Sequence, residues 1–395
     1  MRQEVGRSVA RTIPSIVPDS DALEQRLRRR IEAFTSTARP AVAKLAQKAP
    51  ALEDLADSFP GLLFALATGY GSESDRKAAT SAVLDGIPLR EAANRLGLPF
   101  WLRKLPAASF NGALVDPPSD PQLVARLIAF IPRTPGSAAA WLGRVLTAHA
   151  TGRPEIALWV AAQYRAAQPS PRSENFLTVL AWAWFSAADA DLRASRLLTT
   201  RWTPSMGLRR ATAEARLWRE RIKLDVCLGS GLTDTWIAEG RVGDLAFVAL
   251  RSADDFIAES IAMDNCLDRY GDRLIGRAAR VFSIRRDGRS IADVEIAAHE
   301  QETGHPMISQ LRGPHNRRAP LDVWQAAYAW LGSQPLRLAE KSLRVRVGPV
   351  TKRRRSKAIW QPFIEVLPSQ TQEAAIAVLL GGGVRSRVRG SAGSS

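Results

Sequence analysis

Hydrophobic residues recur at helical spacing from about residue 41 to residue 239, a stretch rich in alanine and leucine. A period of three to four residues predicts amphipathic helices. Breaks that contain proline or glycine separate segments of about 10 to 16 residues, a length that suits helices packed as hairpins. We therefore expect a mostly α-helical, solenoid-like region over residues 21–240, preceded by a flexible lead-in at residues 1–20.

The pattern changes near Arg241, where short apolar and alternating runs predict strands. Asp287-Gly288 is a strong hairpin signal between two of these runs. Ser252, three residues before Asp255, predicts a capping box that opens a helix. The expected strands are residues 245–250, 280–286, 289–297 and 306–312, with a further strand-like stretch at 359–366.

A helix is expected over residues 321–331, with Trp324, Tyr328 and Leu331 facing inward. The fold class predicted for the whole chain is α+β. A small α+β domain over residues 241–368, with a three- to four-stranded antiparallel sheet, follows the helical region. Residues 369–395 are expected to be a mostly disordered tail, since their end is rich in Gly, Ser and Arg.

Composition fits a globular protein, with 46% hydrophobic and 24% charged residues among 395. Two cysteines, Cys227 and Cys266, exclude a disulfide framework. The longest apolar stretch, about 176–188, is shorter than a membrane span, and the N-terminus lacks the apolar region of a secretory signal. We therefore expect a cytoplasmic protein with no membrane partner.

The formal charge of +16 is concentrated toward the C-terminus, where residues 271–395 hold 21 Lys and Arg against 10 Asp and Glu. Such a surplus favours polyanionic partners, DNA or RNA in particular. The same surplus also arises from the arginine-rich composition of proteins encoded by GC-rich genomes. The candidate phosphate contacts are Lys352, Arg353, Arg354, Arg355 and Lys357, together with Arg385, Arg387 and Arg389 of the tail. The alternative is a solvated loop and tail.

Residues 87–105 have the spacing of a helix-turn-helix, with Gly97 at the turn and Ala93 where the helices would meet. The second helix would begin with Phe100, Trp101 and Leu102, although reading DNA requires polar side chains there. This favours a packed helical hairpin over DNA recognition.

The most specific segments are Met263–Tyr270, Arg280–Arg285, Val294–Ile296 and Gln310–Arg317. In this order they resemble the PcfJ family, which is named for a protein encoded on a conjugative plasmid. The resemblance covers about residues 245–332 and implies an association with plasmids, conjugation and mobile elements, but no defined activity. Asn265 departs from the family, which usually has histidine before the cysteine.

Cys266 is a candidate nucleophile if a histidine, a cation or a helix N-terminus lowers its pKa. His299, His305 or His315 would be the base, oriented by Glu295 or Asn316. The alternative is a small buried hydrophobic side chain. The same cysteine and histidines lack the paired spacing of most zinc sites, so no metal is expected.

Strand alternation places Gln310 and Arg312 on one face of their strand. If that face adjoins Asp293 and Glu295, a polar patch forms, and Asn316 reaches it after the Gly313-Pro314 turn. One interpretation is a ligand pocket in which Arg312 contacts an anion. The other is a cross-strand ion pair between Glu295 and Arg312.

No nucleotide-binding loop, zinc-protease motif or serine-hydrolase motif occurs, and no cofactor is expected. Three functions remain open. The preferred one is a non-enzymatic protein that binds nucleic acid or a nucleoprotein partner through its basic C-terminal third. The second is an enzyme, Cys-dependent or other, with a pocket around Cys266, Glu295, Gln310, Arg312 and Asn316. The third is a helical protein–protein adaptor.

Overall fold

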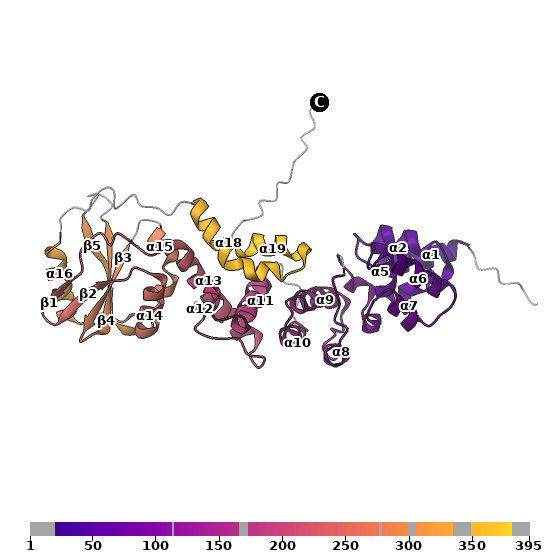
Figure 1. The fold of residues 1–395 in the computed structure, drawn as a ribbon, viewed down its shortest axis with the longest axis horizontal. Coiled ribbons are helices and arrows are strands. Elements are labelled where there is room, and N and C mark those ends of the chain that lie inside the picture. The colour runs from indigo at the N-terminus through magenta and orange to yellow at the C-terminus, as the bar shows by residue number, and fades with distance from the viewer. Residues whose placement is uncertain are drawn as a thin grey trace, which may run out of the picture. The chain divides into compact units, whose positions relative to one another are not determined.

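A computed structural model of the chain describes residues 20–112, 114–165, 173–275, 279–298, 305–334 and 349–380 (Figure 1). The chain divides into unit 1, residues 1–146 with 160–169, and unit 2, residues 147–159 with 170–395. The helices that directly precede the sheet belong to the same unit as the sheet.

Unit 1 is helical in its described residues, and its core is built around one apolar helix. Every residue from Pro60 to Leu66 of this helix, α5, is buried. Phe64 stacks on Phe110, with ring centroids 5.6 Å apart. Gly61 is required there, because a Cβ at this position would lie 2.7 Å from the Phe110 ring. The elements are α1 (Ser20–Glu32), α2 (Arg39–Ala46), α3 (Pro50–Glu53), α4 (Leu55–Ser58), α5 (Pro60–Thr68), α6 (Glu73–Leu84), α7 (Leu89–Arg95), η1 (Phe100–Lys104), η2 (Ala107–Ser109) and α8 (Pro121–Ile128).

The packed helical hairpin favoured for residues 87–105 forms only in part, with one α-helix, α7. A turn at Gly97, with φ of 68°, follows α7, but the next element, η1, is a 3₁₀ helix of five residues. Trp101 and Leu102 are buried in it. The start of this segment is thus packed inward, and only Arg103 and Lys104 at its end are exposed.

The helices of unit 2 include some that precede the strands in the sequence and some that follow them. α9 (Pro135–His149) and α10 (Pro154–Gln163) are each divided between the two units. The remaining elements are α11 (Ser173–Ala187), α12 (Arg193–Arg196), α13 (Leu208–Leu228), α14 (Ala253–Met263), η3 (Leu267–Arg269), α15 (Gly271–Ile275), η4 (Pro314–Asn316), α16 (Leu321–Gly332), α18 (Pro349–Glu365) and α19 (Ser369–Leu379).

One five-stranded antiparallel sheet lies in unit 2, in the order β1-β2-β3-β4-β5. Its strands are β1 (Gly240–Val242), β2 (Leu245–Ala249), β3 (Arg280–Arg286), β4 (Arg289–Ala298) and β5 (Pro306–Arg312). The α+β class is confirmed, with five strands instead of three to four. The additional strand, β1, is joined to β2 by the two-residue turn Gly243-Asp244, since Val242 pairs with Leu245.

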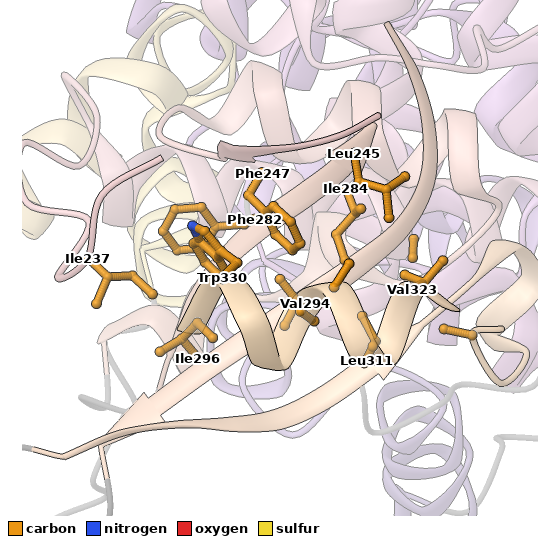
Figure 2. Packing of buried hydrophobic residues seen from close by; sticks show 14 of the residues in the cluster. Ile237, Leu245, Phe247, Phe282, Ile284, Val294, Ile296, Leu311, Val323 and Trp330 are labelled. Carbon is orange, nitrogen blue, oxygen red and sulfur yellow. The ribbon is translucent and has the colours of Figure 1, made fainter. Parts of the chain in front are cut away.

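Helices cover both faces of the sheet. On one face, α16 packs its Trp330 against Phe247 and Phe282 of the strands, as Figure 2 shows. On the other face, α13, α14 and η3 surround Val281 with apolar side chains that include Leu224, Phe256 and Leu267. The capping box of Ser252 and Asp255 forms at the start of α14, as the sequence predicts.

The expected inward face of α16 is wrong at Tyr328, whereas Trp324 and Leu331 do pack against the core. Val323, Ala326, Ala327 and Trp330 are buried, whereas Tyr328 is 60% exposed. Trp324 and Leu331 are half-buried at the border of the core. The predicted and the buried residues both have helical spacing. The small side chains of Ala326 and Ala327 let the helix approach the sheet closely.

The C-terminal segment is helical where a strand and a tail were expected. Residues 359–366 fall mainly in α18, because Trp360, Phe363, Ile364 and Leu367 are buried at helical spacing. Trp360 meets Trp218 of α13 with ring centroids 5.2 Å apart. Residues 369–379 form α19, and residues 381–395 lie outside the described part of the chain.

Candidate functional site

A small pocket lies where η3, three strands and η4 meet. It brings together the five side chains that the sequence singled out: Cys266, Glu295, Gln310, Arg312 and Asn316. Its volume is about 20 Å³, which is room for roughly one water molecule. The remaining lining residues are Asn265, Leu267, Tyr270, Val281 and Asp293.

Strand register explains why the polar side chains face this pocket. Asp293 of β4 pairs with Arg312 of β5, and Glu295 pairs with Gln310. Directly paired residues point to the same side of a sheet. The two polar faces are therefore adjacent, which meets the condition for a polar patch, and they form the side of the pocket made by the sheet.

Glu295 is held from two sides and keeps one oxygen free. Its Oε1 accepts hydrogen bonds from Arg273 at 2.7 Å and from Ser309 at 2.6 Å. The side chain is only 4% exposed, and Oε2 has no hydrogen-bond donor among the described residues. A buried carboxylate oxygen without a donor is costly, so it is a position where a ligand would gain a hydrogen bond.

Arg312 is exposed, and its guanidinium forms no ion pair with any residue that the structure describes. The cross-strand ion pair with Glu295 is not formed, because Arg273 of α15 occupies that carboxylate instead. An unpaired guanidinium at the rim of a pocket is suited to an anionic group.

Tyr270 lies beside the same carboxylate. Burial and the neighbouring negative charge of Glu295 raise the pKa of the Tyr270 phenol well above its ordinary value. Arg273 stacks over the tyrosine ring at 5.5 Å. The phenol therefore stays protonated and is a hydrogen-bond donor inside the pocket.

The segment before Cys266 is fixed to the sheet through Asn265. The α14 helix ends at Asp264 in a left-handed conformation, with φ of 47°. The Asn265 side chain then donates to Asp293 at 2.7 Å and accepts from the Leu267 amide at 3.1 Å. The residue that departs from the PcfJ resemblance thus positions the cysteine. Cys266 is exposed, and Cys227 is buried.

Two consecutive left-handed residues bring Asn316 to the pocket. His315 and Asn316 have φ of 57° and 58°, a conformation that costs roughly 1–2 kcal/mol per residue for side chains other than glycine. The His315 ring bonds the Asp264 carboxylate through Nδ1 at 2.8 Å, which ties η4 to the end of α14. His315 therefore lies near the Cys266 segment but does not line the pocket.

At the sheet side of the pocket, two buried carboxyl groups lie next to each other. Asp293 lies beside Glu259 of α14, and burial together with that negative neighbour raises the pKa of Asp293 to about 8. Ser283 and Ser290 donate to the two oxygens of Glu259 at 2.8 and 3.0 Å. The protonated carboxyl avoids placing two negative charges side by side in the interior.

Three residues that contribute to this site were not predicted, although the sequence contains a signal for two of them. Glu259 stands on the buried stripe of α14, three residues after Phe256, where an apolar residue would be typical. Arg273 follows Tyr270 at helical spacing. The role of Asn265 depends on its contact with β4, 28 residues away, and no local pattern encodes it.

The histidines do not form a metal site with Cys266 in the described ranges. No group of three or more His, Cys, Asp or Glu side chains is placed there to hold a metal ion. His299 lies outside the described residues, and His305 precedes β5.

The basic run of residues 352–357 lies on α18 and is not uniform. Arg353, Arg354 and Lys357 are exposed, and Lys352 and Arg355 are half-buried. The Arg355 guanidinium packs against Gly229 at the end of α13, where a Cβ would collide with it. It faces the negative end of the α13 dipole, so its contact is structural. The tail arginines 385, 387 and 389 lie outside the described residues.

Comparison with known proteins yields no match to a family model, a curated protein or a solved structure. The resemblance to the PcfJ family, with its plasmid and mobile-element context, therefore stays a prediction. Among the described residues, no helix has both the length and the apolar character needed to cross a bilayer.

Proposed function

We propose that the pocket beside Cys266 is a thiol-dependent active site for a ligand with an anionic group. The observation that carries this proposal is the convergence of five side chains from four separate segments on one pocket. Of the three functions expected from the sequence, the enzymatic alternative is the one this geometry supports best.

Each group has a role in the proposed chemistry. Arg312, Gln310 and Asn316 bind the anionic or carbonyl oxygens of the ligand. Glu295, through its free Oε2, accepts the thiol proton. The sulfur of Cys266 then forms a bond to an electrophilic carbon, and the leaving group departs with the proton from Glu295. Because the pocket holds little more than a water molecule, one group of the ligand enters and the remainder stays at the exposed rim.

Alkylation of Cys266 tests this arrangement with two reagents of similar size, anionic iodoacetate and neutral iodoacetamide. Arg312→Gln is expected to lower the ratio of the iodoacetate rate to the iodoacetamide rate about two- to fivefold, since one exposed charge contributes roughly 0.5–1 kcal/mol. Glu295→Gln is expected to slow the neutral reagent, because the proton acceptor is removed. Peptide mapping by mass spectrometry gives each rate, with buried Cys227 as an internal reference.

The matched control is Arg317→Gln, an exposed arginine near Arg312 that does not line the pocket. It should leave the ratio unchanged. An equal drop in both arginine variants, or a rate with iodoacetamide that is insensitive to Glu295→Gln, would contradict the proposed roles.

A second proposal, binding of DNA or RNA, rests on the exposed face of α18. Arg353, Arg354 and Lys357 are exposed there and form no ion pair with described residues. Replacing all three with alanine is expected to weaken binding to single-stranded DNA and RNA. It should also flatten the plot of log affinity against log salt, by about 0.7 for each phosphate that the variant no longer binds.

Three exposed arginines of α13, Arg209, Arg210 and Arg216, provide a control of equal charge in the same unit. Their alanine variant should keep the original slope. A decrease in slope that is the same in both variants would show that overall charge, and not α18, attracts the nucleic acid.

A further inference from the structure

Unit 1 contains an open groove that the functions above do not use. It runs between α7, η1 and α8, and its volume is about 1050 Å³. This is at the upper limit of the roughly 300–1,000 Å³ typical of small-molecule clefts. The groove therefore has room for the side chains of a folded segment.

The walls of the groove are largely apolar. Val124 and Ile128 of α8 form an aliphatic side, half-buried, opposite Pro99 and Phe100. Trp101 lines it too, but is buried and donates its indole N–H to the Pro118 carbonyl at 2.9 Å. Half-buried aliphatic side chains along a groove are where a partner could bury its own apolar surface.

Three cations stand at the rim of this groove. Arg90, Arg103 and Lys104 are exposed and form no ion pair with residues in the described ranges. No acidic side chain is among the groove's lining residues. The rim is thus complementary to an occupant with negative charges on its flanks.

Nucleic acid fits this groove less well than a peptide. A base needs a free aromatic face on which to stack. The guanidinium groups of Arg90 and Arg103 already lie over the Phe100 ring, at 5.0 and 5.7 Å, and Phe59 meets it at 5.7 Å. A nucleobase would have to displace these contacts, whereas an aliphatic side chain can bind beside Val124 and Ile128.

From these observations we infer that the groove binds a short amphipathic helix of a partner protein, with an aliphatic stripe flanked by acidic residues. The stripe lies against Val124 and Ile128, and the carboxylates pair with Arg90, Arg103 and Lys104. Helices bind hydrophobic grooves through anchors at positions i, i+3, i+4 and i+7.

Fluorescence anisotropy with the full chain tests this inference. The probe is a labelled helical peptide of about 16 residues, long enough to form a helix, with leucines on one stripe and glutamates beside it. The matched probe carries lysine in place of each glutamate. The glutamate peptide is expected to bind. The double variant Arg103→Glu, Lys104→Glu is expected to lower the affinity for this peptide at least about tenfold, because like charges then face each other. The same variant should gain affinity for the lysine peptide.

Two further variants separate the groove from overall charge. Val124→Asp should lower the affinity for the glutamate peptide although the rim cations are unchanged. Arg126→Glu changes an exposed arginine of α8 that does not line the groove, and should have little effect. The inference is overturned if the glutamate peptide does not bind below millimolar concentration, or if all variants bind it equally. It is also overturned if an oligothymidylate binds more tightly and its binding is abolished in the Arg103, Lys104 variant.

Discussion

Replacing Trp330 with alanine is expected to lower the free energy of unfolding by about 3–5 kcal/mol, the usual cost of deleting a large buried aromatic side chain. Trp330 is 1% exposed and stacks on Phe247, with ring centroids 4.4 Å apart and an interplanar angle of 10°. It also meets Phe282 edge-on at 4.8 Å. The alanine variant leaves a cavity between α16 and the sheet that the rigid strands cannot close.

Chemical denaturation monitored by circular dichroism measures this decrease in stability. Tyr328→Ala is the matched control, because this aromatic residue lies on the same helix but is 60% exposed. It should change the free energy of unfolding by no more than about 0.5 kcal/mol. Similar decreases in the two variants would mean that α16 does not pack on the sheet through Trp330.

Replacing Asp268 with alanine is expected to cost about 3–5 kcal/mol, because it leaves a buried arginine without its partner. Arg221 of α13 donates to Asp268 of η3 at 2.9 Å, and the two residues are 8% and 3% exposed. Arg221 also donates to Thr199. Since Asp268 follows Cys266 by two positions, its removal should also loosen the segment that presents the thiol.

The double variant Arg221→Met, Asp268→Leu separates the missing partner from the ion pair itself. It removes both charges, and we expect it to be clearly more stable than Asp268→Ala under denaturant. The exposed pair of Arg251 and Glu239 provides a reference, since Arg251→Ala should cost about 1 kcal/mol or less. A double variant as unstable as the single one would indicate that the pair itself is required for packing.

Local signals predicted most of the sheet. Asp287-Gly288 adopts the positive φ values of a two-residue hairpin turn, and the strands on either side begin and end close to where alternation places them. The Ser252 and Asp255 capping box is similarly local. These features depend on neighbours within a few residues, which the sequence displays directly.

Long-range packing determined the features that the sequence did not reveal. Two stripes of α16 have helical spacing, and only contact with the sheet selects the one with Trp330, which lies over Gly240 where a Cβ would come within 2.9 Å of the indole. The apolar run at 359–366 suits a strand or a helix equally. Its packing on Trp218 makes it helical.

The sequence predicted the polar residues of the candidate site but not the residues that hold them in place. Strand alternation placed Glu295 on one face of its strand and Gln310 with Arg312 on one face of theirs. The observed register puts these two faces on the same side of the sheet. Of the two interpretations left open, the ion pair between Glu295 and Arg312 does not form, because Arg273 of α15 binds Glu295 instead. The sequence did not predict how α15 approaches the sheet. Because Arg273 pairs with Glu295, Arg312 has no carboxylate partner among the described residues.

The carboxyl pair of Asp293 and Glu259 makes folding of unit 2 a proton-uptake reaction. In an unfolded chain an aspartate has a pKa of about 3.9, whereas in the fold Asp293 keeps its proton up to about pH 8. Between these values the folded state binds a proton that the unfolded state has released. The stability contributed by this group is therefore complete below about pH 4 and is lost as pH rises through about 8. Raising the pH from about 4 to about 8 thus destabilises the layer between α14 and the sheet, on which the Cys266 pocket is built.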